Sequence, residues 1–560
     1  MMGGRWVSVG AERAASQGAY CLDGSTPGMW HQPAKDAASS RSWLIFLDGG
    51  AWCCACVHAP PILHESPLTA RACRMPAADD INSCASRSRG FKGSARDVKD
   101  TFWAYSGYMD GRVDVNPSFA NFHRVHLHYC DGASYSGDRA EPLLHGKDQA
   151  PIYLRGRRVL QAQMQAALDL GLRSAKEVLF SGGSAGGIGA LIAANWVRDM
   201  VPNARRFKIL IASGFFLDQG SASSASAALP LASASSSPAA AAASSPTRPH
   251  ARARAERLAG RASSTSGALP MPSLAASTSG DGTSGDGISG GEAPPGVGNG
   301  GAADGAAGEK AECHKGHGTS SSCLPWTIKM KRMCELHNCT AAAMASGCGT
   351  ELHPSQRWRC LLGRHAAAHV RVPTFYINSA VDSWQVVNVW RRFPRCRWDG
   401  QSGCSPASVV AHVDETNRMM DSFMSDLRLS GALDRPGNGA FLTSCNEHVA
   451  SLTKQAFGGY RNTVDGTLMR DALHRWWRAP EDAPAVRHTY LPCRLLHYPG
   501  NGSAAEGAGS GGSSGGRRGP GGNRLLGHGH LLGHHACNPS CDAYRTKRRL
   551  SQECPCSPPR

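Results

Sequence analysis

A serine with very small neighbours is the clearest candidate for chemistry in this sequence. Gly182-Gly183-Ser184-Ala185-Gly186 matches the pattern G-x-S-x-G, in which the serine hydroxyl attacks an acyl carbon. Small residues suit a sharp turn from a strand into a helix, because a larger side chain there would clash. The turn would lift the Ser184 hydroxyl above a sheet and place the Ala185 N–H at a helix N-terminus, facing an oxyanion. The alternative interpretation is an ordinary glycine-rich turn.

A serine hydroxyl also needs a general base, and that base needs an orienting carboxylate. Asp382 follows the apolar run 372–380, and His448 follows the apolar run 439–444. With Ser184 they give the order Ser, Asp, His that α/β-hydrolases use. The chain has 23 histidines and 43 acidic residues, so order alone does not single out this pair.

Each partner has another interpretation. Asp382 could cap a helix that starts near Trp384, and His448 could be an exposed loop histidine. Glu447 and Asp414 are the nearest rivals of Asp382 for the role of the carboxylate. These alternatives stay open on residue order alone.

A second glycine-rich turn could complete an oxyanion hole. It follows the apolar run that begins at Ser42, and it contains Gly49, Gly50 and Ala51. Backbone N–H groups reach a substrate most easily where side chains are minimal. A plain turn at the end of a strand is the other interpretation.

Apolar runs separated by turn residues predict the elements that must position these groups. The pattern predicts strands alternating with helices, which indicates an α/β fold with a mostly parallel sheet flanked by helices. Strands are expected at Ser42–Gly50, Arg124–Gly132, Glu177–Gly183, Phe207–Gly214, Val372–Ala380 and Gly439–Ser444. Helices are expected at Arg157–Leu170, Ile188–Met200, Trp384–Trp390, Val409–Leu429 and Leu468–Trp477.

Composition divides the 560 residues into segments. Ala-Ser-Gly-rich text at 219–308 and Gly-rich text at 500–533 lack large apolar side chains and predict disordered insertions. The remaining text predicts one catalytic domain built from 21–218 and 309–499, with a cysteine-containing closing segment at 534–560. Residues 1–20 are expected to be a disordered N-terminal segment.

Charge and cysteine content limit the classes of protein. The net charge of +17 favours acidic partners without choosing among them. No apolar run reaches the roughly 18 residues that a membrane-spanning helix needs. The 21 cysteines favour an oxidising compartment, although the N-terminus lacks the apolar core of a secretory signal.

Several segments, in order along the chain, resemble the pectin acetylesterase family, to which the Notum carboxylesterases are related. CLDGSTPGMW from Cys21, LDGGAWC from Leu47 and the block NPSFANFHRVHLHYCDGASYSGD from Asn116 are similar to uncommon family sequences. YLRGRRV, SGGSAGG, SAVDSWQV, TSCNEHV and CNPSC continue the match toward the C-terminus. Together they extend over nearly all of the chain outside the two low-complexity tracts and the extreme termini.

The resemblance implies an α/β-hydrolase-like fold and a role for each candidate. Ser184 would be the nucleophile, His448 the general base and acid, and Asp382 its orienting carboxylate, while Gly50, Ala51 and Ala185 would donate N–H groups to the oxyanion. It implies hydrolysis of acetyl esters on cell-wall galacturonan through an acyl-enzyme, without a cofactor. We further expect a secreted monomer that has an acetylated polysaccharide as its partner and no specific nucleic acid.

The sequence departs from the family pattern at three positions. Gly183 and Val449 replace cysteines beside the nucleophile and the histidine, and Ala212 stands where the family has an aspartate. The first two changes predict the loss of a local disulfide or thiol and leave the three triad residues in place. The effect of Ala212 on the choice of substrate stays open.

Three other functions compete with this hypothesis. A Notum-like enzyme would remove a fatty acyl group from a protein and would need a deep apolar pocket. A zinc site would draw on Cys53, Cys54 and Cys56 with histidines near the C-terminus, but the spacing is not that of a known site. The histidines concerned are His528, His530, His534 and His535. A basic polysaccharide- or nucleic-acid-binding protein would rest on the positive charge alone.

Overall fold

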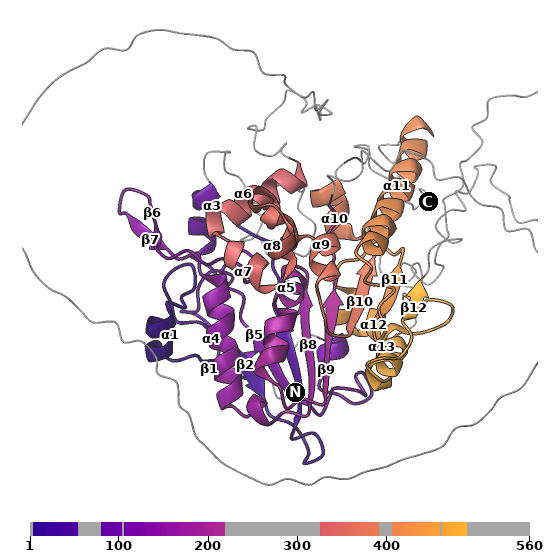
Figure 1. Ribbon diagram of the computed structural model, residues 1–560, viewed down its shortest axis with the longest axis horizontal. Coiled ribbons are helices and arrows are strands. Elements are labelled where there is room, and N and C mark those ends of the chain that lie inside the picture. The colour runs from indigo at the N-terminus through magenta and orange to yellow at the C-terminus, as the bar shows by residue number, and fades with distance from the viewer. Residues whose placement is uncertain are drawn as a thin grey trace, which may run out of the picture. The chain divides into compact units, whose positions relative to one another are not determined.

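The computed structural model has a 10-stranded sheet at the centre of the described residues, with the strand order β12-β11-β10-β9-β8-β3-β5-β2-β1-β4 (Figure 1). The strands from β5 to β12 in this order are parallel, and β2, β1 and β4 are antiparallel. The bounds are β1 Gly4–Ser8, β2 Gly28–Gln32, β3 Ser42–Leu47, β4 Thr101–Phe102, β5 His123–Leu127, β8 Glu177–Gly183, β9 Arg206–Ala212, β10 Thr374–Ser379, β11 Gly439–Thr443 and β12 Val486–Thr489. A separate hairpin pairs β6 Leu143–His145 with β7 Ala150–Ile152.

Helices connect the parallel strands and cover the sheet, and Figure 1 shows α4 and α5 lying along it. The α-helices are α1 Ala11–Gln17, α3 Asp80–Arg87, α4 Gly156–Asp169, α5 Ala185–Met200, α6 Trp326–His337, α7 Thr340–Ala345, α8 Cys348–Glu351, α9 Gly363–Ala368, α10 Ser383–Gln385, α11 Pro406–Leu429, α12 Lys454–Phe457 and α13 Met469–Arg478. Shorter turns are η1 Gly107–Met109, η2 Leu172–Ser174, η5 Pro354–Leu361, the π-helix η6 Val386–Trp390 and η7 Ala450–Leu452.

The structure describes residues 4–53, 80–102, 106–218, 325–390, 392, 406–459 and 462–489. All of them belong to one unit made of Met1–Ala227 and Cys313–Arg560. The predicted insertions at 219–308 and 500–533 and the closing segment 534–560 lie outside the described residues. None of the described helices combines the length and the apolar character that crossing a membrane requires.

The central strands are buried on both faces, which explains their almost continuous apolar sequences. Along β3, Ile45 and Leu47 join one core cluster while Leu44 and Phe46 join the other, as the alternation of side chains in a strand requires. The first cluster also takes residues of α4, α5, α6, α9 and α11, and the second takes residues of α13. The α/β prediction from the spacing of apolar runs is confirmed.

The expectation of a disordered segment at 1–20 is wrong for the described residues 4–20. β1 pairs with β2 along the register from Arg5↔His31 to Ser8↔Gly28, and Ala14 of α1 is fully buried. The Trp6 ring packs on Trp30 with 4.8 Å between centroids. A short, partly exposed strand near the edge of a sheet needs few apolar residues, so its sequence carries little signal.

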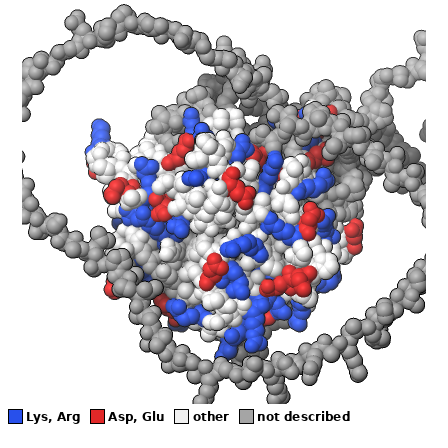
Figure 2. Space-filling view, in the orientation of Figure 1, with Lys and Arg blue, Asp and Glu red and all other residues white. Residues whose placement is uncertain are grey.

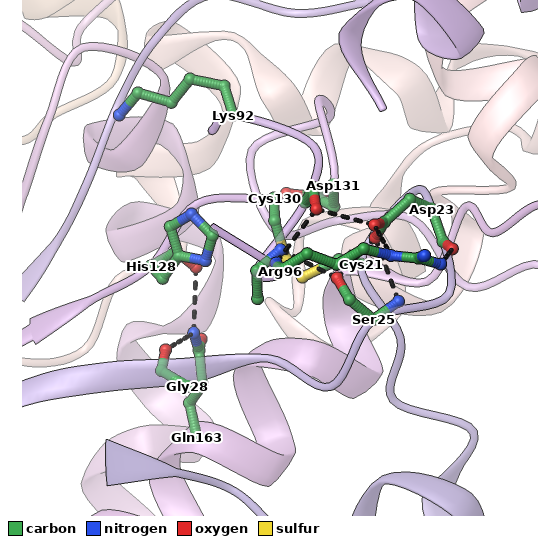
Figure 3. The surroundings of a disulfide bond; sticks show 12 residues. Cys21, Asp23, Ser25, Gly28, Lys92, Arg96, His128, Cys130, Asp131 and Gln163 are labelled. Atoms are coloured by element: carbon green, nitrogen blue, oxygen red, sulfur yellow. Dashed lines mark hydrogen bonds and ion pairs between the residues drawn. A yellow bond between two sulfur atoms is a disulfide. The ribbon is translucent and has the colours of Figure 1, made fainter. Parts of the chain in front are cut away.

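Disulfides tie the loops at one end of the sheet together. Cys21–Cys130 joins the segment before β2 to the segment after β5 across a sequence separation of 109 (Figure 3). Gln163 of α4 lies beside this bond and donates to the carbonyls of Gly28, 2.7 Å away, and His128, 2.9 Å away. The other described pairs are Cys53–Cys84, Cys334–Cys339 and Cys348–Cys360.

Candidate active site

Ser184 occupies the junction between β8 and α5 in a backbone conformation that a side chain rarely adopts. Its φ is 55° and its ψ is −125°. The backbone is fixed on both sides, because Ser184 N donates to Ala212 O at 2.9 Å and Ser184 O accepts from Gly187 N at 2.8 Å. The side chain is partly exposed and makes no capping hydrogen bond to α5. A partly exposed serine with a strained backbone at a strand-to-helix turn is what a nucleophile of this kind requires.

The neighbouring glycines are required by close backbone contacts. A Cβ on Gly182 would lie 2.1 Å from Gly186 O, and a Cβ on Gly186 would lie 2.1 Å from Leu47 O. Such distances exclude any larger residue without a shift of the backbone. The G-x-S-x-G sequence therefore serves a packing constraint as well as the exposure of the serine.

His448 and Asp382 come together although 66 residues separate them. His448 Nδ1 lies 2.8 Å from Asp382 Oδ2 and 3.0 Å from Oδ1, and the Asp382 side chain is fully buried. Asp382 Oδ1 also accepts from the N–H groups of Trp384, at 3.1 Å, and Gln385, at 3.0 Å. Asp382 is therefore a helix cap and a histidine partner at once, so the two interpretations of this residue do not exclude each other.

The structure distinguishes Asp382, which contacts His448, from the two rival carboxylates. Glu447 accepts a hydrogen bond from the side chain of Asn462, and Asp414 lies within α11. Among the described residues no hydrogen bond joins Ser184 to His448. Catalytic hydrogen bonds in ligand-free enzymes often form only when the substrate is bound.

The glycine-rich turn after β3 lies against Ser184. A Cβ on Gly49 would be 3.0 Å from Ser184 Cβ and 2.4 Å from Gly183 O. Gly50 and Ala51 both have positive φ, of 138° and 55°. Within the described residues, no acceptor takes the N–H of Gly50 or Ala51, and Ala185 is the first residue of α5, whose N–H has no partner inside the helix. The three predicted oxyanion donors thus have N–H groups available on two adjacent segments.

Two side chains hold the carbonyls of this turn. Arg87 Nη2 donates to Gly50 O at 2.8 Å, and the Tyr129 hydroxyl donates to Ala51 O at 2.8 Å. Arg87 is itself fixed by donating Nε to Lys92 O at 2.9 Å and by lying 5.1 Å above the Tyr129 ring. Because the carbonyls are held, the orientation of the peptide N–H groups is also held.

A buried ion pair supports the start of the same turn. Asp48 Oδ1 accepts from Gly49 N at 2.9 Å, while Asp48 Oδ2 contacts Lys92 Nζ and lies 3.6 Å from His126 Nε2. Burial raises the pKa of Asp48, but the Lys92 charge and the contacts with His126 outweigh it and hold that pKa well below its usual range. Asp48 is therefore a charged anchor for the turn.

Four aromatic rings pack together next to the His448 ring, and one of them, Trp52, directly follows Ala51 in the turn after β3. We call Trp52, Phe216, Trp326 and Trp384 the aromatic cluster. All six pairs of rings have centroids between 5.3 and 5.8 Å apart. The cluster reaches His448, whose ring lies 6.3 Å from that of Trp384 and 6.5 Å from that of Phe216. Five of the six pairs are edge-to-face and the Phe216–Trp326 pair is tilted by 31°, so the rings pack closely against one another.

The residues of the zinc alternative are only partly described. Cys53 is bonded to Cys84, and His337 Nε2 lies 3.2 Å from Cys53 Sγ. Burial lowers the pKa of His337 to about 3. A sulfur held in a disulfide is no thiolate ligand. Cys54, Cys56, His528, His530, His534 and His535 lie outside the described residues.

Sequence reasoning missed Arg87, Tyr129 and the aromatic cluster. Arg87 lies 37 residues from Gly50, and no local pattern connects the two. The sequence pattern predicted Trp384 only as the first residue of a helix. The positions of all these residues depend on which strands become neighbours in the sheet.

The chain is similar to one protein family over most of its length. A family model described as Pectinacetylesterase matches residues 9–231 and 324–495. The two matched parts lie on either side of residues 232–323 and include Ser184, Asp382 and His448.

Curated relatives show more limited similarity. Pectin acetylesterase 5 of Arabidopsis thaliana is 31% identical over 205 residues, which are 37% of this chain and 41% of that protein. Pectin acetylesterase 4 of the same plant is 30% identical over 208 residues, or 37% and 44%. The palmitoleoyl-protein carboxylesterase notum2 of Xenopus laevis is 27% identical over 202 residues, or 35% of each chain. The chain therefore spans less than half the length of these relatives.

A solved structure shares the fold. The Wnt deacylase Notum from Drosophila aligns with a TM-score of 0.50 and 15% sequence identity, covering 87% of this chain and 96% of that one. At this identity the likeness concerns the fold alone, and it agrees with an α/β-hydrolase-like sheet.

Proposed function

Because this chain belongs to the pectinacetylesterase family, we propose that it is a serine esterase that removes acetyl groups from galacturonan. Three observations support the proposal: the positive φ of Ser184 at the start of α5, the close approach of the glycine-rich turn after β3 to Ser184, and the contact of His448 with Asp382. Ester hydrolysis needs these three groups of residues and no cofactor.

Each proposed step follows from a residue's position. Ser184 Oγ attacks the acyl carbon while His448 Nε2 takes its proton, and Asp382 binds Nδ1, which leaves Nε2 to act as the base. The N–H groups of Gly50, Ala51 and Ala185 stabilise the oxyanion of the tetrahedral intermediate. His448 then protonates the leaving sugar hydroxyl. Water, activated by His448, finally hydrolyses the acyl-Ser184 ester and releases acetate.

The aromatic cluster supports a short acyl group. Trp52, Phe216 and Trp326 are at most 3% exposed, and their rings contact one another beside the oxyanion turn. A fatty acyl chain would need an apolar pocket of considerable depth, whereas an acetyl group needs only a shallow one. Removal of a fatty acyl group from a protein, the activity that the names of the Notum relatives print, is therefore the weaker candidate.

We also propose that the protein works outside the cell, at the cell wall. The four described disulfides support this location, because such bonds persist in oxidising compartments. We also expect the protein to be a monomer. A mass increase on reduction and alkylation of protein recovered from the medium would test the compartment.

Acetate release from acetylated polygalacturonate tests the function. The wild-type chain should release acetate, and Ser184→Ala and His448→Ala should each abolish the release without unfolding the protein. Ser174→Ala is a matched control, because the Ser174 hydroxyl is exposed and donates only to the carbonyl of Gly171. Retention of wild-type activity in Ser184→Ala would refute the mechanism, and a preference for esters of about eight carbons or more would favour the fatty acyl alternative.

A further inference from the structure

A cavity of about 760 Å³ opens at the end of the sheet opposite to Ser184. It is lined by the residues that start β3, β8 and β9 and by the turn that follows α13. Ser184 follows the last residue of β8, which has seven residues, so the two sites are roughly 20 Å apart along the strand. The cavity volume is typical of a ligand site.

Three basic residues stand in one row along this cavity. Arg41, Lys176 and Arg205 each directly precede one residue of the aligned set Ser42↔Glu177↔Arg206, which pairs β3, β8 and β9 in parallel. Neighbouring strands lie about 4.8 Å apart, so the sheet fixes the spacing of the row. Backbone hydrogen bonds hold the row in place. Lys176 N donates to Arg41 O at 2.8 Å, and Arg205 N donates to Lys176 O at 2.9 Å.

The acidic residues of the cavity already have partners. Glu177 contacts Arg206 and accepts from the Ser42 hydroxyl, and Glu481 accepts from the N–H of Phe207 at 3.1 Å. By contrast, within the described part of the chain, no carboxylate forms an ion pair with Arg41, Lys176 or Arg205. Like charges at such spacing repel one another unless an anion lies between them. Figure 2 shows Lys and Arg side chains gathered at the lower end of the molecule, where β8 and β9 begin in Figure 1.

We propose that the cation row Arg41–Lys176–Arg205 binds the carboxylates of a polyuronate chain at a site separate from the esterase centre. This assignment rests on the proposed function, because de-acetylated galacturonan carries one carboxylate per sugar. Because a polyuronate repeats its carboxylate at every sugar, one chain can present more than one carboxylate to the three cations.

The rest of the cavity suits a sugar rather than a simple anion. The hydroxyl groups of Ser40 and Ser42 donate to Ala37 O and Glu177 and can still accept hydrogen bonds, and Ala37, Ala38 and Pro480 add small apolar surfaces. A uronate presents a carboxylate, several hydroxyl groups and an apolar ring face, and it can use all three kinds of contact. Phosphate groups would use the cations and hydroxyl groups but not the apolar surfaces.

Binding to polygalacturonate of the triple variant Arg41→Gln, Lys176→Gln, Arg205→Gln tests the proposal. We expect affinity to fall at least tenfold, on the order expected when charge-assisted hydrogen bonds are lost. Hydrolysis of p-nitrophenyl acetate should remain at the wild-type rate. The control Arg5→Gln, Lys99→Gln, Lys147→Gln removes the same charge from three exposed residues that form no described ion pair, and it should bind like the wild type.

Each result of the binding experiment either supports or overturns the proposed polyuronate site. An equal loss of affinity in both triple variants would show that net charge alone attracts the polymer, which overturns the proposal. Polyphosphate binding with the same affinity and the same dependence on the three residues would overturn the assignment to uronates. Ser184→Ala should keep full binding, so that loss of activity and loss of this site are distinguished. Binding of the methyl-esterified polymer should be weak, since its carboxylates are neutralised.

Discussion

The Asp382 carboxylate binds His448 Nδ1 with both oxygens, at 2.8 and 3.0 Å, while Oδ1 also caps the helix that starts at Ser383. One buried side chain thus fixes both the histidine ring and the chain that follows the strand β10. The two roles can be separated by substitution, because they depend on different properties of the carboxylate.

Replacing Asp382 with asparagine should separate charge from capping. Asparagine caps helices about as well as aspartate, but it cannot stabilise the imidazolium of His448. We expect kcat to fall by roughly 10⁴ with little change in the melting temperature. Asp382→Ala should lose the cap as well, at a further cost of about 1 kcal/mol in the free energy of unfolding. Kinetics together with thermal unfolding measure both effects, and an active Asp382→Asn enzyme would refute this role.

Replacing Arg87 with glutamine should slow the chemical step. The Gly50 carbonyl would lose its donor, and the oxyanion turn would no longer be held in one orientation. Removing a true oxyanion donor costs about 10²–10³ in kcat, so we expect a loss of about tenfold or more from this positioning residue, with KM nearly unchanged.

Arg96→Gln is the matched control, because Arg96 is exposed and pairs with Asp23. Arg87→Lys should recover part of the rate. Lysine keeps the charge and can donate to one of the two carbonyls that Arg87 contacts, those of Gly50 and Lys92. A rise in KM with unchanged kcat would contradict a role in holding the oxyanion turn.

Replacing Trp384 with alanine should broaden the range of acyl groups. Trp384 is the partly buried member of the aromatic cluster, and its removal opens space beside His448. Each buried CH₂ contributes about 0.8 kcal/mol, so the ratio of kcat/KM for p-nitrophenyl butyrate to that for the acetate should rise on the order of tenfold. Trp477→Ala removes a ring from the other core cluster and should leave this ratio unchanged.

Stability should depend on pH through Asp131. Burial raises the pKa of Asp131 to about 7, although Ala133 N and Tyr135 N donate to its carboxylate. The same group in the unfolded chain titrates near about 3.9. The folded state therefore holds the proton more tightly, and this contribution to stability is full below pH ~4 and is lost as the pH rises through about 7.

Thermal unfolding between pH 4 and 8 measures this effect. The melting temperature of the wild type, taken relative to that of Asp131→Asn, should decline as the pH rises through this range. An unchanged difference between the two proteins would mean that Asp131 does not titrate there. The Arg96→Gln variant reports the pH response of the other groups.

Local steric constraints explain why β3, β8 and the turn at Ser184 could be predicted from the sequence. The two-residue alternation along β3 and the apolar run of β8 identify buried strands, because every second side chain must enter a core. Gly182 and Gly186 identify the turn at Ser184, because only glycine tolerates contacts as close as 2.1 Å. The partly exposed strand β1 was missed, since burying one face of a short strand needs few apolar residues.

The sequence by itself therefore determined the strands, the nucleophile turn and a set of candidates in the order Ser184, Asp382, His448. Only the tertiary structure decided that Asp382, rather than Glu447, holds His448, that Arg87 holds the turn at Gly50, and that four aromatic rings meet beside it. The reason is physical. Steric constraints act between neighbours in the chain and restrict which residue types can stand there, so they are visible in the sequence. These contacts depend instead on which distant strands become neighbours in the sheet.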